Sequence, residues 1–203
     1  MGLDMYLYKK NPIYSSIVAA TMVDRYLPWS HGLPEEVQKA IETIQPLEEV
    51  AYWCKANQIH NFFMNCGGEW AEFPGDDPYD EDHNCGMKSI SRSTLKVLIG
   101  LCEDILDGGF TLDGKPEVIK VEPKEWENFC NKKYEEDTEW DSKFKLVNEE
   151  LARELLPTSK GFFFGSQEFD YWYADDLYST INQLNEILAK WDSETEIYYH
   201  PWW

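Results

Sequence analysis

The chain has 203 residues, of which 43% are hydrophobic and 15% aromatic, so it can bury the core of one domain. Thirty-eight acidic residues against 18 Lys and Arg give a formal net charge of −20. This balance argues against direct binding to nucleic acid or to an anionic membrane, because basic side chains make the phosphate contacts. Two explanations of the acidity stay open: solubility, and docking on a basic partner surface.

The start MGLDMYLYKK lacks the regions of a secretory signal peptide. No window approaches the roughly 18 apolar residues that a membrane span needs. The five cysteines are an odd number, which favours reduced thiols over a disulfide framework. We therefore expect a protein of the cytosol.

Alternation of apolar and polar residues at the start predicts a half-buried strand, with Leu3, Met5 and Leu7 on its buried face. A helix is then expected between Pro34, which suits a first helical turn, and Pro46, which stops it. The intervening residues before Pro34 are irregular in pattern.

A short strand over 48–52 is expected to lead into a helix. On that helix Trp53, Ala56, His60 and Phe63 share one face at helical spacing. The following stretch, GGEWAEFPGDDPYDEDHNCG, contains seven acidic residues and no Lys or Arg, and its Gly and Pro content predicts a loop.

Residues 87–90 predict a strand, and Ser91 or Ser93 is the candidate N-cap of a helix that Gly108 and Gly109 end. The next segment, FTLDGKPEVIKV, predicts a hairpin that turns at Asp113–Gly114.

A short helix is expected over 123–131. Asn148 is expected to cap another helix, which ends before Pro157.

The stretch GFFFGSQEFDYWYADDL, residues 161–177, predicts a strand buried on both faces that turns into the longest helix. Ser166 is the N-cap candidate of that helix. Residues 196–203 are expected to form a last strand or a docked tail. The buried stripe of the helix is expected at Tyr173, Leu177, Ile181, Leu184, Leu188 and Trp191. Strands and helices without regular alternation predict a single α+β domain, with a mixed or antiparallel sheet packed against several helices.

The junction at Gly165 and Ser166 has two interpretations. Free N–H groups at a helix N-terminus favour an anion, yet every capped strand-to-helix junction has this geometry, and no phosphate-loop motif is present. Asp170, Asp175 and Asp176 likewise suit either acid–base work or a favourable interaction with the helix dipole.

The one metal constellation in the sequence, His60, Cys66, His83 and Cys85, has the spacing of no common zinc finger. We therefore expect no metal and no cofactor. His60 alone suits a base or a ligand contact, but a single histidine on a helix face is more often structural.

Three segments, MGLDMYL, YWCKANQIHNFF and LLPTSKGFFFGSQEFDYWYADDL, resemble a family of small uncharacterised proteins of bacteriophages and prophages. The resemblance implies a phage or prophage origin and a bacterial host cytosol. It brings no established activity, so no catalytic residue is carried over. Relative to the family pattern, residues 108–147 look like an insertion, comprising a hairpin and a short helix, within one domain.

The first functional hypothesis, which the charge and the resemblance favour, is an interaction protein that binds and modulates a host protein through an acidic surface, as an inhibitor or counter-defence factor that imitates nucleic acid. Its candidate contacts are the aromatic and acidic residues of the loop. They are Trp70, Phe73, Asp76, Asp77, Tyr79, Asp80, Glu81 and Asp82.

The alternative is a protein or enzyme that binds a small, nucleotide-like molecule, with a pocket where the central helix meets the FFFGS junction. Its candidate contacts are polar and aromatic residues of those two segments. They are Trp53, Asn57, His60, Gly165, Ser166, Asp170 and Tyr171. A structural or virion accessory role is also open, and the sequence fixes neither the oligomeric state nor the order of strands.

Overall fold

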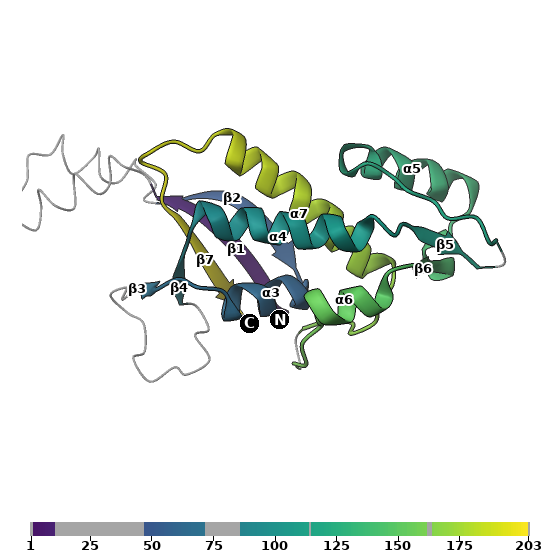
Figure 1. Cartoon of the computed structure of the whole chain (residues 1–203), viewed down its shortest axis with the longest axis horizontal. Helices are drawn as coiled ribbons and strands as arrows, with labels where there is room; N and C mark the ends of the chain where they lie inside the picture. The colour runs from purple at the N-terminus through teal and green to yellow at the C-terminus, as the bar shows by residue number, and fades with distance from the viewer. Residues whose placement is uncertain (1, 11–46, 72–85, 114, 162–163, 203) are drawn as a thin grey trace, which may run out of the picture.

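The computed structural model describes residues 2–10, 47–71, 86–113, 115–161 and 164–202. Within these ranges, a five-stranded antiparallel sheet packs against helices in one α+β unit, as predicted (Figure 1). The helix expected between Pro34 and Pro46 lies outside the described residues. No helix in the described ranges is both long and apolar enough to cross a membrane.

The sheet has the strand order β2-β1-β7-β4-β3. Strand β1 (Asp4–Lys10) lies between β2 (Leu47–Cys54) and β7 (Ile197–Trp202), and β4 (Met87–Ile90) joins β7 to the short edge strand β3 (Trp70–Ala71). The C-terminal segment is therefore the middle strand of the sheet. The sequence left open whether residues 196–203 form a last strand or a docked tail, and the described part of the segment forms the strand.

One face of the sheet forms the core with α3 (Asn57–Asn65), α4 (Arg92–Leu106) and α7 (Tyr171–Ala189). The predicted alternation in β1 is confirmed, because Leu3, Met5 and Leu7 are completely buried. Trp53 belongs to β2 rather than to the following helix, yet its side chain is buried in the same core.

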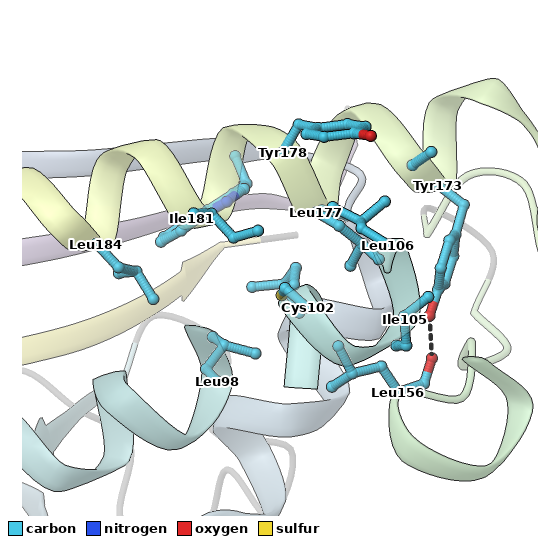
Figure 2. Packing of buried hydrophobic residues seen from close by; sticks show 14 of the residues in the cluster. Leu98, Cys102, Ile105, Leu106, Leu156, Tyr173, Leu177, Tyr178, Ile181 and Leu184 are labelled. Carbon is cyan, nitrogen blue, oxygen red and sulfur yellow. Dashed lines mark hydrogen bonds between the residues drawn. The ribbon is translucent and has the colours of Figure 1, made fainter. Parts of the chain in front are cut away.

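Helices α4 and α7 pack directly on each other. Figure 2 shows side chains such as Leu98 and Cys102 of α4 pointing toward Leu177 and Ile181 of α7. Ser91 is the N-cap of α4, since its Oγ accepts a hydrogen bond of 3.1 Å from the Thr94 N–H. The predicted apolar stripe of α7 is confirmed at its buried positions Tyr173, Leu177, Ile181 and Leu184 and at the partly buried Leu188, whereas Trp191 lies beyond the end of the helix.

The predicted N-cap of α7 is wrong. Asp170, not Ser166, caps the helix, because its Oδ1 accepts hydrogen bonds of 3.0 and 3.2 Å from the N–H groups of Trp172 and Tyr173. Ser166 lies four residues earlier, where its Oγ accepts a hydrogen bond from the Glu168 N–H at 3.1 Å. A carboxylate at the N-cap also interacts favourably with the helix dipole.

The prediction of a central strand at 161–164 is also wrong at residues 161 and 164, the two that the structure describes. The Phe164 N–H donates to the Gly161 carbonyl at 3.2 Å, which closes a turn, and Gly165 follows with φ +82°. Phe162 and Phe163 lie outside the described residues. A glycine in the left-handed region bends the chain, and β7 takes the central place in the sheet.

The hairpin expected at 110–121 is reduced to a single bridge between Phe110 and Ile119. Strand β5 (Phe110–Leu112) pairs instead with β6 (Phe144–Leu146). Gly114, the predicted turn residue, lies outside the described residues. The distant β6 supplies the longer ladder because both strands bury apolar side chains together.

Helix α5 (Trp126–Glu136) follows a 3-10 turn, Pro123–Glu125, and extends beyond the expected helix. A second 3-10 turn, Trp140–Lys143, precedes β6. Helix α6 (Glu149–Leu155) begins after Asn148 as predicted. The Asn148 side chain, however, donates to the carbonyls of Asp104 and Ile105 at the end of α4.

An aromatic cluster attaches residues 108–147 to the start of α7. The Trp126 ring stacks on Tyr178 with centroids 4.1 Å apart, and Trp126 Nε1 donates to Asp175 Oδ1 at 2.7 Å. Further rings complete the cluster: Phe110, Phe129, Trp140, Phe144 and Tyr171. This segment is thus packed into the fold through its aromatic residues.

Candidate functional site

A pocket of about 370 Å³ opens between the β2–α3 connection and the beginning of α7. Its lining combines carboxylates, amides, hydroxyls and a lysine with the apolar surface of two aromatic residues and a cysteine. The principal polar residues are Lys55, Asn57, Gln58, Ser166, Asp170 and Asp176. The volume suits a small ligand, since such sites generally occupy roughly 300–1,000 Å³.

The β2–α3 connection places Lys55 in an unusual backbone conformation, with φ +63°. Its N–H donates to the Leu3 carbonyl at 2.7 Å, and its own carbonyl accepts from the Asn57 N–H at 2.8 Å. A non-glycine residue in this region carries strain on the order of 1 kcal/mol or more. Because strained residues concentrate at functional sites, this outlier is a second indication of a site here.

Asn57 holds the opposite wall of the pocket. Its side chain is only 1% exposed. The Nδ2 group donates to the carbonyls of Phe164 and Ser166 at 2.9 and 2.7 Å, and Oδ1 accepts from the Ser159 N–H at 2.9 Å. A single amide therefore fixes both ends of the loop that precedes α7.

Gly165 allows this loop to approach the connection closely. A Cβ atom at Gly165 would lie 3.0 Å from the Lys55 Cβ and 3.3 Å from the Lys55 carbonyl oxygen. Its φ of +82° also favours glycine. The loop and the strained connection thus form two walls in direct contact.

Asp176 carries the main chemical feature of the pocket. Gln58, itself 2% exposed, donates from Nε2 to Asp176 Oδ2 at 2.9 Å. Burial is the largest of the effects that together raise the pKa of Asp176 to about 7; the Gln58 hydrogen bond opposes it, and the charges of Asp175 and Asp170 act in the same direction as burial. This carboxyl group therefore exchanges its proton near neutral pH.

The backbone beneath Asp176 is held by a buried relay. Trp53 Nε1 donates to Thr180 Oγ1 at 2.9 Å, and Thr180 Oγ1 donates to the Asp176 carbonyl at 2.6 Å. Trp53 therefore supports the pocket from the core side, since its own side chain is 3% exposed and is not among the lining residues.

The charges around the pocket are predominantly negative. Glu168, Asp170 and Asp176 supply carboxyl groups, and Lys55 supplies the cation. Trp172, whose side chain is 59% exposed, places an aromatic ring at the rim. Carboxylates beside an exposed indole ring can bind an organic cation through ion pairing and cation–π interaction.

Of the residues predicted from the sequence to bind a small ligand, some line this pocket and others do not. Asn57, Gly165, Ser166 and Asp170 all line the pocket. Tyr171 does not, because it is 6% exposed within the aromatic cluster around Trp126 and Trp140. An aromatic residue at the start of an amphipathic helix packs on whichever neighbour buries it, and that neighbour is the distant segment 108–147.

His60 is also in the core and not in the pocket lining. It is 5% exposed, its Nδ1 lies 2.6 Å from the Tyr199 hydroxyl oxygen, and burial lowers its pKa to about 4. Its ring also contacts Phe164 edge-on. These contacts fit the structural interpretation, with His60 joining α3 to β7.

Most of the predicted protein-contact loop lies outside the described residues, namely Phe73, Asp76, Asp77, Tyr79, Asp80, Glu81 and Asp82. Trp70 is described in β3, where the Lys88 ammonium lies 5.5 Å from its ring centroid. The suggested metal ligands His83 and Cys85 are likewise outside, and Cys66 Sγ donates to the Phe63 carbonyl. Among the described residues, no group of three or more His, Cys, Asp or Glu side chains could hold a metal ion.

Sequence reasoning missed Lys55 and Gln58 and did not single out Asp176 among the acids of α7. The helical spacing contains a partial signal, because Asp176 lies three residues after the buried Tyr173 and four before the buried Thr180. The left-handed conformation of Lys55 could not be expected from the sequence, because lysine has no preference for it.

No protein-family model, curated protein or solved structure matches this chain. The chemistry of the pocket is therefore argued from its own residues.

Proposed function

We propose that the protein binds a small organic cation in the pocket between α3 and α7, with Asp176 as the anchoring carboxylate. The observation that carries this proposal is the Gln58–Asp176 pair, in which a half-buried carboxyl group lines a pocket and has a pKa of about 7. A perturbed titratable group in a cleft is a recognised indication of a functional site.

The charges of the pocket specify the ligand class. Glu168 and Asp170 add negative charge to that of Asp176, which disfavours a phosphate group and favours an amine, amidine or guanidine. The exposed Trp172 ring offers a face to the same cation. The nucleotide-like ligand considered from the sequence is thereby narrowed to a cationic or base-like molecule without phosphates.

The proposal implies a characteristic pH dependence. A cation pairs with the ionised form of Asp176, so binding should strengthen as pH rises through its pKa of about 7. A bound cation should in turn lower that pKa, because it stabilises the carboxylate. Ligand affinity and protonation of one side chain are thus linked.

A thermal-shift panel tests the proposal directly. The probes are putrescine, agmatine, arginine and adenosine, with ATP as the anionic comparison. A ligand at 100 times its dissociation constant adds about 2.7 kcal/mol to the stability of the folded chain. We expect an amine or guanidine to raise the melting temperature at pH 8, and ATP to leave it unchanged.

Two variants locate the effect. Asp176→Asn should abolish the shift, whereas Asp107→Asn, which changes an aspartate exposed at the surface and ion-paired to Lys120, should retain it. A flat response across the panel, or an equal response of both variants, would contradict the proposal.

A further inference from the structure

The face of the sheet that points away from α3 and α7 forms a second surface, which shares no residue with the pocket. In β1 the polar residues alternate with the buried leucines and methionine, and register places their partners on the same face. Tyr6 pairs with Tyr52 of β2 and with His200 of β7, Tyr8 pairs with Tyr198, and Asp4 pairs with Trp202. We call Tyr6, Tyr8, Tyr52, Tyr198, His200 and Trp202 the tyrosine face.

Four rings of the tyrosine face, those of Tyr6, Tyr8, Tyr52 and His200, are in contact. Tyr6 lies 5.6 Å from Tyr8, 5.2 Å from Tyr52 and 6.1 Å from His200 between ring centroids. Because these rings belong to paired strands, their arrangement is formed before any partner arrives, which reduces the entropy lost on binding.

The helices α3 and α7 pack on the opposite face, as the contacts of His60 with Tyr199 and of Trp53 with Thr180 show. Trp202 is 51% exposed and Tyr52 is 42% exposed. The other four rings are half-buried. Tyrosines inside a core need no further function, but a group of exposed and half-buried rings on the outer face of a sheet has the composition of an interaction surface.

Carboxylates border these rings. Tyr52 donates its hydroxyl hydrogen to Asp4 Oδ1 at 2.7 Å, and Tyr198 donates to Glu196 Oε2 at 2.9 Å. Glu49 lies opposite Tyr8 in the register. Lys10 at this end of the face is ion-paired to Glu196 at 3.0 Å, so the border formed by these described residues is negative overall.

The surface is too broad for a small molecule. From Asp4 to Tyr8 the strand covers roughly 13 Å, and three neighbouring strands add about 10 Å across. Carboxylates at the border disfavour a nucleic acid, since its phosphates would be repelled. Electron-rich rings edged by carboxylates are suited to arginine, whose planar guanidinium stacks on aromatic faces and pairs with carboxylates.

We infer that the tyrosine face binds a protein segment rich in arginine, with Trp202 and Tyr52 as the exposed anchors and Glu49 as a bordering charge. The residues of this surface differ from those of the acidic loop considered from the sequence. It gives a chain of net charge −20 a defined place for a basic partner.

The test uses the full-length chain and a short synthetic peptide of alternating arginine and serine, titrated by isothermal calorimetry. The comparison probes are the same peptide with glutamate in place of arginine and an oligouridylate RNA. The arginine peptide should bind and the other two should not. Trp202→Ser should weaken binding about tenfold, as expected for an exposed aromatic anchor, and Glu49→Lys should weaken it several-fold with a stronger effect at low salt.

Two controls separate this surface from the pocket. Trp172→Ser removes an exposed tryptophan elsewhere, and Asp176→Asn removes the pocket carboxylate; both should leave the peptide affinity unchanged. Unchanged melting temperatures establish that the variants are folded, and Glu49→Lys carries the test if Trp202→Ser unfolds. Absence of peptide binding, equal binding of the RNA, or loss of affinity only in the two control variants would overturn the inference.

Discussion

Gln58 donates a hydrogen bond of 2.9 Å from Nε2 to Oδ2 of Asp176, and so joins the first turn of α3 to the second turn of α7. The donor amide is nearly completely buried. The bond favours the ionised carboxylate, while burial favours the protonated acid, and burial is the larger effect on the pKa. The pair is therefore balanced between two protonation states near neutral pH.

Replacement of Asp176 by Asn should change how stability depends on pH. The folded-state pKa of about 7 lies above the ordinary value of 3.8, so between these values the folded chain holds a proton that the unfolded chain has lost. The contribution of Asp176 is fully present below about pH 4 and is lost as pH rises through 7. Between about pH 4 and pH 8, the unfolding free energy of the variant should therefore rise by on the order of 1–2 kcal/mol relative to that of the wild type, after allowance for the partial exposure of Asp176.

Urea denaturation at several pH values measures this difference. The test is the difference in unfolding free energy between the wild type and Asp176→Asn at each pH. His60, whose pKa is lowered to about 4, changes the stability of both proteins with pH in the opposite direction, and this effect cancels in the difference. Its contribution to stability falls as pH decreases below its ordinary value of 6.5. A stability difference that is independent of pH would contradict the raised pKa of Asp176.

Replacement of Asn57 by Ala should destabilise the chain and loosen the pocket wall. The amide makes three partly buried hydrogen bonds, to Phe164, Ser166 and Ser159, and the backbone groups left behind would lose this partner. We expect a loss of about 2–3 kcal/mol in the free energy of unfolding. Hydrogen exchange should accelerate at residues 159–166 in particular. As the matched control, Asn65→Ala, whose side chain is exposed and bonds only within α3, should change stability by less than about 0.5 kcal/mol.

Replacement of Lys55 by Gly should relieve backbone strain at the pocket. Glycine adopts the φ of +63° without steric cost, and the gain of roughly 1 kcal/mol is partly offset by the greater freedom of glycine in the unfolded chain. We therefore expect thermal denaturation to show stability that is equal to or slightly above that of the wild type. Lys55→Ala keeps the strain while removing the charge, and should be less stable than Lys55→Gly; the reverse order would argue against strain.

Replacement of Lys88 by Met should cost more than most surface changes. The Lys88 side chain is buried, and its Nζ donates to the carbonyls of Phe63, Met64 and Cys66 at the end of α3. Methionine fills the volume but removes the ammonium donor from these three carbonyl groups, of which the Phe63 carbonyl keeps the Cys66 Sγ donor, at a cost of about 3 kcal/mol. Chemical denaturation measures the loss. Lys96→Met, at an exposed position of α4, serves as the control and should have little effect.

Elements with a strong local period could be predicted from the sequence. The alternation of β1 and the stripe of α7 both specify a buried face without reference to the rest of the chain, and the Ser91 cap of α4 is a local interaction. The class of the fold followed from these elements together.

The remaining features depend on partners distant in the chain. The FFF stretch resembles a buried strand, but the Asn57 side chain and the positive φ of Gly165 hold its flanks in a turn. Phe110 pairs with Leu146 of a distant strand and keeps only one bridge, to Ile119, of the expected local hairpin. Part of the pocket could be predicted because its polar residues lie near the start of a helix. These residues are Asn57, Gly165, Ser166 and Asp170. Gln58 and Asp176 could not be paired in advance, because their contact depends on how α3 lies against α7.

The most direct measurement is the titration of the Asp176 carboxyl carbon by ¹³C NMR, assigned by comparison with the Asp176→Asn variant, with and without the amine that gives the largest thermal shift. We predict a midpoint at about pH 7 in the free protein and a lower midpoint with the amine bound, because the cation stabilises the carboxylate. A midpoint near the ordinary value of 3.8, or one that the amine leaves unchanged, would contradict a cation site at Asp176.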